Sequence, residues 1–190
     1  MLKAFVGTCA VICSIAAISI PSSAQEIIHA LTGTVSSIDT ASKSITVFQD
    51  AGTRPVTYQL WNNSKTRIAF DKRIQPETVA ATKFDKQGAY VIVFYFGGDS
   101  DRTAVALESL GAGPFQSTNG TVVHYDSKAH SLTVQDDSGK TETFKFDDKT
   151  VAETGMGAVD GSSFRADKGD HVRVVSSVVN GTPTALFVRE

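Results

Sequence analysis

The chain contains the stretch TGTVSSIDTASKSITVFQDAG at residues 32–52 and a second version, NGTVVHYDSKAHSLTVQDDSG, at residues 119–139. The two stretches align without gaps, and later features follow in the same order, so that the strand pattern YVIVF corresponds to HVRVV. Internal self-similarity of this kind is typical of a duplicated structural unit. We therefore expect two units of similar fold.

Each unit shows the period of β-strands. Apolar residues alternate at Ile45, Val47 and Tyr58 in the first unit and at Leu132 and Val134 in the second, and Asp-x-Gly turns separate the segments. This pattern predicts an all-β fold, and about five strands per unit favour a small OB-like β-barrel. A pair of β-sandwiches is the alternative, although a sandwich usually needs about seven strands.

The connecting segments set the predicted domain boundaries. Residues 76–83 fit a short helix with proline at its first position. The counterpart in the second unit, GMGAVDGSSFRADKG at residues 155–169, is a Gly-rich loop, and its first part, GMGAVDG at residues 155–161, predicts a flexible connection. The run Gly111-Ala112-Gly113-Pro114 cannot continue regular structure and indicates a linker. We therefore predict a first barrel at residues 25–113 and a second at residues 114–190.

The motif G-T-V-x-x-[IY]-D, followed by [IL]-T-V, D-x-G, K-G-D-x-V and T-x-A, resembles an uncharacterised repeat family, a domain of unknown function, of secreted bacterial proteins. The resemblance covers about Leu31 to Leu110 and Thr118 to Glu190. It implies an OB-like barrel for each copy and defines no functional residues. The first copy departs from the pattern where Lys86-Gln87-Gly88 stands in place of the Lys168-Gly169-Asp170 of the second.

Residues 1–24 have the layout of a secretory signal peptide, in which an apolar run ends at Pro21 and small residues follow. We expect cleavage after Ala24, export to the periplasm or the exterior, and no membrane span afterwards; an uncleaved anchor is the alternative. The only two cysteines, Cys9 and Cys13, lie in this segment. The remaining chain therefore has no thiol for a disulfide, for catalysis or for metal binding.

The charge distribution argues against a nucleic-acid partner. The formal net charge is -2, and acidic and basic residues are interspersed along the chain. Proteins that bind nucleic acid usually present a basic face that neutralises phosphates. We expect a small ligand, a glycan or a protein as partner instead.

The segment AYVIVFYFGG, residues 89–98, is hydrophobic on both faces. A barrel strand needs only one apolar face, so the second must pack on the short helix, on the sister unit or on a partner. We name Trp61, Tyr90, Phe94 and Tyr95 as candidates for a ligand or partner surface. The partner is a second copy of the chain if a homodimer forms through this strand.

Two histidines flank a predicted hairpin of the second unit. If Val122 pairs with Leu132 on the core face, His124 lies directly opposite His130, with Cβ atoms about 5 Å apart. Two imidazoles at that separation can share a metal ion. The alternative is a pair of solvated histidines at a hairpin tip.

The sequence contains neither H-E-x-x-H nor G-x-S-x-G. We predict a non-enzymatic exported protein without a cofactor, acting as a binding or envelope-associated interaction module. One alternative is a structural protein that self-associates through residues 89–98. The other is a metal-binding or stress-related protein that uses His124 and His130.

Overall fold

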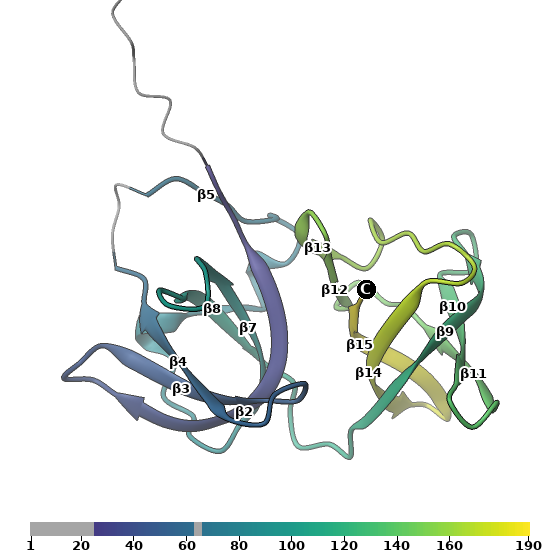
Figure 1. The fold of residues 1–190 in the computed structure, drawn as a ribbon, viewed down its shortest axis with the longest axis horizontal. Helices are drawn as coiled ribbons and strands as arrows, with labels where there is room; N and C mark the ends of the chain where they lie inside the picture. Colours follow the sequence, from purple (N-terminus) through teal and green to yellow (C-terminus); the bar gives the residue numbers. More distant parts are fainter. Residues whose placement is uncertain (1–24, 63–65) are drawn as a thin grey trace, which may run out of the picture.

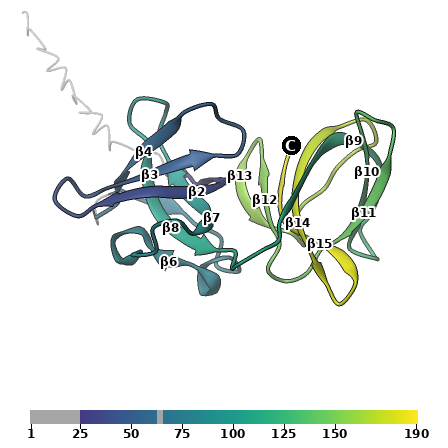
Figure 2. The same cartoon turned by 90° about the horizontal axis from the view of Figure 1, so that it is seen from below.

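The computed structural model of the chain describes residues 25–62 and 66–190, and the predicted signal peptide lies outside this part. The protein is all-β, as predicted. Two curled sheets lie side by side, joined by one short segment (Figure 1, Figure 2). Within the described residues, no helix has the length and apolarity needed to cross a membrane.

The first sheet is a closed five-stranded β-barrel. Its strands are β2 (His29–Asp39), β3 (Ser44–Gln49), β4 (Pro55–Leu60), β7 (Tyr90–Phe96) and β8 (Thr103–Ser109). They pair in the order β4-β3-β2-β7-β8 with antiparallel neighbours, and parallel pairing of β4 with β8 closes the ring. The short strand β6 (Val79–Ala80) pairs in antiparallel with β8 at Leu107 and Ala106.

The second sheet begins after a strand-free connection that contains the predicted linker. Its strands are β9 (Gln116–Asp126), β10 (Ser131–Asp136), β11 (Thr141–Lys145), β12 (Val151–Thr154), β13 (Gly157–Asp160), β14 (His171–Val179) and β15 (Thr182–Arg189). The order is β11-β10-β9-β14-β15-β12-β13, and one parallel pair, Lys145 with Thr184, joins β11 to β15. We refer below to β1 to β8 as the first half and to β9 to β15 as the second half.

Alternate apolar residues of the strands face the two cores, whereas Phe48, which belongs to the same predicted strand pattern, is exposed. Ile45, Val47 and Tyr58 are buried in the core of the first half. Leu132 and Val134 occupy the core of the second half. The period of two along each strand thus separates the core face from the outer face.

Both predicted connecting segments differ from expectation. The predicted helix at residues 76–83 is replaced by two 3-10 turns, η1 (Gln75–Glu77) and η2 (Ala81–Lys83), because β6 between them pairs with β8. The flexible connection predicted at residues 155–161 is wrong, since most of it forms the β12–β13 hairpin. The Ala158 N–H donates to the Ile28 carbonyl at 2.7 Å, so this hairpin is fastened to the first half. The remaining short strands, β1 (Glu26–Ile27) and β5 (Ile68–Ala69), pair in parallel.

A third apolar cluster lies between the halves and joins them. Ile92 and Phe94 of β7 are fully buried there against residues of the second half, including Val175 and Phe187. The ring of Phe70 packs against that of Phe94, with 5.1 Å between the ring centroids. The surplus apolar face of residues 89–98 is therefore covered by the second half of the same chain.

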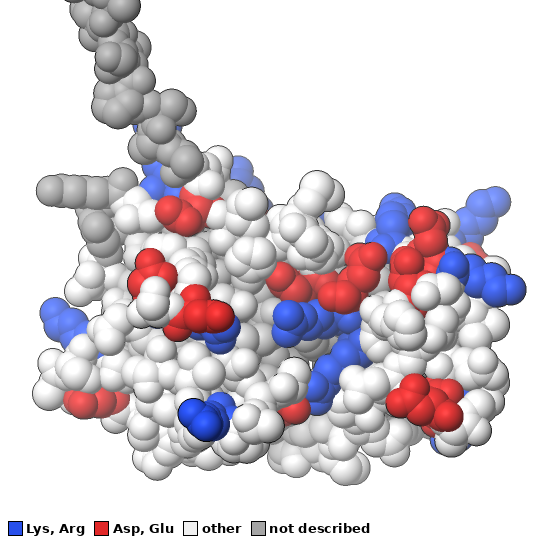
Figure 3. Space-filling view, in the orientation of Figure 1, with Lys and Arg blue, Asp and Glu red and all other residues white. Residues whose placement is uncertain are grey.

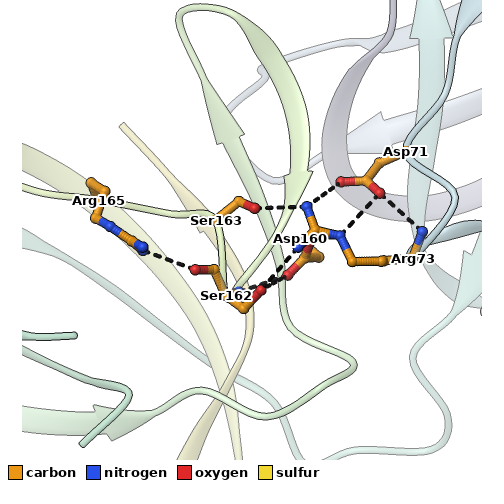
Figure 4. Close-up of polar contacts among 6 residues, drawn as sticks. All are labelled: Asp71, Arg73, Asp160, Ser162, Ser163 and Arg165. Atoms are coloured by element: carbon orange, nitrogen blue, oxygen red, sulfur yellow. Dashed lines mark hydrogen bonds and ion pairs between the residues drawn. The ribbon is translucent and has the colours of Figure 1, made fainter. Parts of the chain in front are cut away.

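Polar side chains fasten one edge of this interface (Figure 4). Arg73, in the first half, pairs through Nε with Oδ2 of Asp160 at 2.6 Å and donates to Oγ of Ser163 at 2.7 Å. Asp71 orients the same guanidinium at 3.2 Å from Nη2. Because the Arg73 side chain is 58 % exposed, these contacts orient the halves more than they stabilise them.

Candidate functional site

Another part of the boundary between the halves is hollow. A cavity of about 350 Å³ opens to solvent there, and residues of both halves line it: His29, Tyr95, Gly97, Asp99, Arg102, Glu153, Thr154, Gly155, Arg189 and Glu190. In Figure 3, Lys and Arg side chains gather where the halves meet, with Asp and Glu side chains beside them. A volume of this size is in the range of small-ligand pockets.

The strand register explains why polar side chains line this cavity. Three apolar residues, Val175, Phe187 and Val151, form a row across β14, β15 and β12 in the buried interface. Side chains two positions apart on a strand point to the same face. Two positions farther along each strand stand Arg173, Arg189 and Glu153, which pair in the same way. The face that forms the apolar interface therefore continues as a polar row along the groove.

Glu153 connects this row to the first half. Its Oε1 accepts a hydrogen bond from Nδ1 of His29 at 2.7 Å, and its Oε2 accepts one from the Ala30 N–H at 2.7 Å. Burial raises the pKa of Glu153 above its usual value, while the hydrogen bonds from His29 and Ala30 act in the opposite direction. Both carboxylate oxygens are thus occupied within the protein.

The other wall is formed by Tyr95 and Arg102 of the first half. The Arg102 guanidinium lies 5.5 Å from the centre of the Tyr95 ring and forms an ion pair with Asp99. Tyr95 also packs edge-on against the buried ring of Tyr58 at 5.4 Å and faces the His29 ring at 5.9 Å. Burial raises the pKa of Tyr95 above its usual value. This wall offers an aromatic face beside a cation.

The groove extends over the second half. A shallower cavity of about 520 Å³ shares Arg189 and Glu190 with the first and adds Arg173, Asn119 and His171. The two cavities therefore adjoin each other at Arg189 and Glu190, and we refer to them together as the groove.

A polar network lies beneath this part of the groove. Asp50 accepts hydrogen bonds from the hydroxyls of Thr32, at 2.6 Å, and Tyr90, and it lies 3.8 Å from Nη2 of Arg173. Burial, followed by the hydrogen bond to Asp50, raises the pKa of Tyr90 well above its usual value. The Tyr90 ring packs against Phe115 at 4.8 Å. Tyr90 thus supports the groove from below.

The structure separates the four aromatic residues that we named from the sequence. Of these four, Tyr95 lines the groove and Tyr90 lies beneath it. Phe94 is fully buried between the halves and belongs to the interior, because the second half covers its face of β7. Trp61 lines a different cavity of about 390 Å³ on the first half, together with Phe96.

The predicted pairing of His124 with His130 is wrong. Val122 pairs with Val134 and His124 with Thr133, because Val123 between them forms a bulge that shifts the register. His130 lies in the turn with a φ of +48°. No group of three His, Cys, Asp or Glu side chains suited to a metal ion occurs within residues 25–62 and 66–190. Metal binding by the two exposed histidines stays a prediction.

Sequence reasoning missed His29, Arg102, Glu153 and Arg189. Their common signal is a charged or polar side chain inside or beside an apolar strand, as Arg173 in HVRVV also is. Such a side chain indicates the edge of an interface or a binding site, but the pattern does not show which of these residues contact one another.

The chain matches no protein-family model and no curated protein. The resemblance to a secreted bacterial repeat family therefore stays a prediction.

Proposed function

We propose that this protein is a non-enzymatic exported binding module, built of two tandem OB-like barrels, that holds a small polar ligand in the groove between them. Export rests on the predicted signal peptide. The tandem architecture is supported by the strand order, because β4-β3-β2-β7-β8 and β11-β10-β9-β14-β15 follow the same path in their halves. A bulge also occurs at the matching place, where Val35 and Ser37 pair with consecutive residues of β3.

The observation that carries this proposal is the convergence of both halves on one solvent-open cavity. Ligand sites are concave, and a few placed polar groups in them fix the orientation of the ligand. Here the first half supplies the aromatic face of Tyr95 and the Arg102 cation, and the second half supplies Arg189. The His29–Glu153 hydrogen bond fixes the floor between them before any ligand arrives.

Gly155 allows a direct test, because it lines the cavity and a Cβ placed there has no heavy atom within 4 Å. Gly155→Trp therefore adds bulk to the lining of the cavity at a position where a side chain has room to begin. Ala129→Trp places the same bulk at the exposed β9–β10 turn and serves as the control.

The experiment is calorimetric titration of the purified protein with a panel of monosaccharides, amino acids and dicarboxylates. We expect at least one saturable ligand whose binding is lost in Gly155→Trp and kept in Ala129→Trp. The proposal fails if no panel member binds, or if every binder is equally affected by both variants.

A further inference from the structure

Two arginines stand directly opposite each other in the groove. Arg173 of β14 and Arg189 of β15 are register partners on neighbouring antiparallel strands, so their side chains leave the same face with Cβ atoms about 5 Å apart. Like charges at such positions destabilise a sheet. The interface face of the second half therefore carries an electrostatic cost at this place.

Acidic groups near the pair offset only part of this cost, and two of them, Asp137 and Glu190, line the same cavity as the arginines. Asp50 is 3.8 Å from Arg173, but its Oδ2 already accepts from Thr32 and Tyr90. Glu153 is the register partner of Arg189 on β12, but both of its oxygens are held by the first half. Arg189 is exposed and forms no ion pair with any residue that the structure describes.

Two side chains that can donate hydrogen bonds also stand beside the pair. Asn119 of β9 is the register partner of Arg173, and His171 stands two positions before Arg173 on β14. Both residues line the cavity of about 520 Å³ that the arginines share. Nε of Arg173 donates a hydrogen bond to Oγ of Ser117 at 3.1 Å, and this contact orients the guanidinium group. The Arg173 side chain is 20 % exposed and lines the cavity.

From this arrangement we infer that Arg173 and Arg189 together bind an oxyanion, a carboxylate or a phosphate, carried by the ligand of the groove. The inference rests on the proposed function and names the chemistry of its ligand. An oxyanion between the two guanidiniums replaces their repulsion with two charge-assisted interactions, and the planar fork of arginine matches such oxygens. The remaining groove, with Tyr95 and Arg102, then receives the rest of the molecule.

The test titrates the purified protein with inorganic phosphate and, separately, with succinate, at constant ionic strength set with sodium chloride. Arg189→Gln and Arg173→Gln are the test variants. Lys128→Gln, at the exposed β9–β10 turn, removes the same charge elsewhere and is the control. Arg189 is exposed, so its variant is expected to fold even if Arg173→Gln does not.

We expect one or both probes to bind the wild type, and each arginine variant to weaken binding by about ten- to a hundredfold, as loss of a charge-assisted hydrogen bond does. Lys128→Gln should change the affinity by less than about twofold, as surface substitutions usually do. Comparison of phosphate with succinate shows which oxyanion is preferred. Without any probe, Arg189→Gln should melt at the same temperature as the wild type or higher, because the repulsion is gone.

Two results overturn the inference: neither probe binds, or the probes bind all variants equally. If a panel ligand nevertheless binds the wild type and no longer binds Gly155→Trp, the proposed function of the groove stands and only the oxyanion chemistry is refuted. If Gly155→Trp abolishes the binding of no panel ligand either, the proposed function and the oxyanion site are both refuted.

Discussion

Gly157 lies where the β12–β13 hairpin approaches the first half closely. It lies at the start of β13 with a φ of +103°, in the region that L-residues avoid. A Cβ added there would lie 2.6 Å from the Ile28 carbonyl oxygen and 2.6 Å from Cγ2 of Ile27. Gly157→Ala therefore both strains the turn and pushes the hairpin away from the first half.

The expected loss can be assembled from two contributions. An L-residue in left-handed backbone costs about 1–2 kcal/mol. The hydrogen bond from the Ala158 N–H to the Ile28 carbonyl, 2.7 Å long, contributes about 1 kcal/mol and is broken if the hairpin moves. We expect Gly157→Ala to lower the free energy of unfolding by roughly 2–3 kcal/mol.

Urea unfolding followed by circular dichroism measures this loss, and amide hydrogen exchange at Ala158 locates it. The control is Gly155→Ala in the same turn, where the added Cβ meets nothing within 4 Å and φ is not positive. The control should unfold within about 0.5 kcal/mol of the wild type. Equal stability of the two variants, with unchanged exchange at Ala158, would refute the close approach on which this reasoning rests.

Two further predictions concern the interface. Phe94→Ala should lower the free energy of unfolding in urea by about 3–5 kcal/mol, because the ring is fully buried between the halves. Phe48→Ala, at a residue that is 46 % exposed, should lower it far less. Equal losses in the two variants would contradict the burial of Phe94 between the halves. Burial, followed by the charge of Glu77, raises the pKa of Glu108 from 4.5 to about 7. The folded state then holds a proton that the unfolded state has released, so the wild type loses stability as the pH rises from about 4.5 to 7, by at most about 3 kcal/mol. Glu108→Gln should remove this slope in urea midpoints measured across that range, and a slope that persists unchanged would refute the assignment.

The core strands could be predicted because their signal is local. Ile45, Val47, Leu132 and Val134 face inward as the period of two requires, and turns separate the strands where Asp-x-Gly occurs. The histidine pairing failed for an equally local reason, since one extra residue in β9, Val123, shifts the partners and no residue type announces it. Gly157 is a similar case: the glycine-rich sequence suggested flexibility, but the glycine is needed for a close approach to Ile28.

The sequence by itself determined the all-β class, the alternation of core and surface along each strand, and the need to cover the second face of residues 89–98. The tertiary structure decided that the second half covers this face and that a groove remains beside it. It also brought His29 to Glu153, 124 positions away, and set Arg173 opposite Arg189. The physical reason is that inward and outward positions follow from neighbours along one strand, whereas the charges that meet in the groove depend on the pairing register and on how the two halves pack against each other.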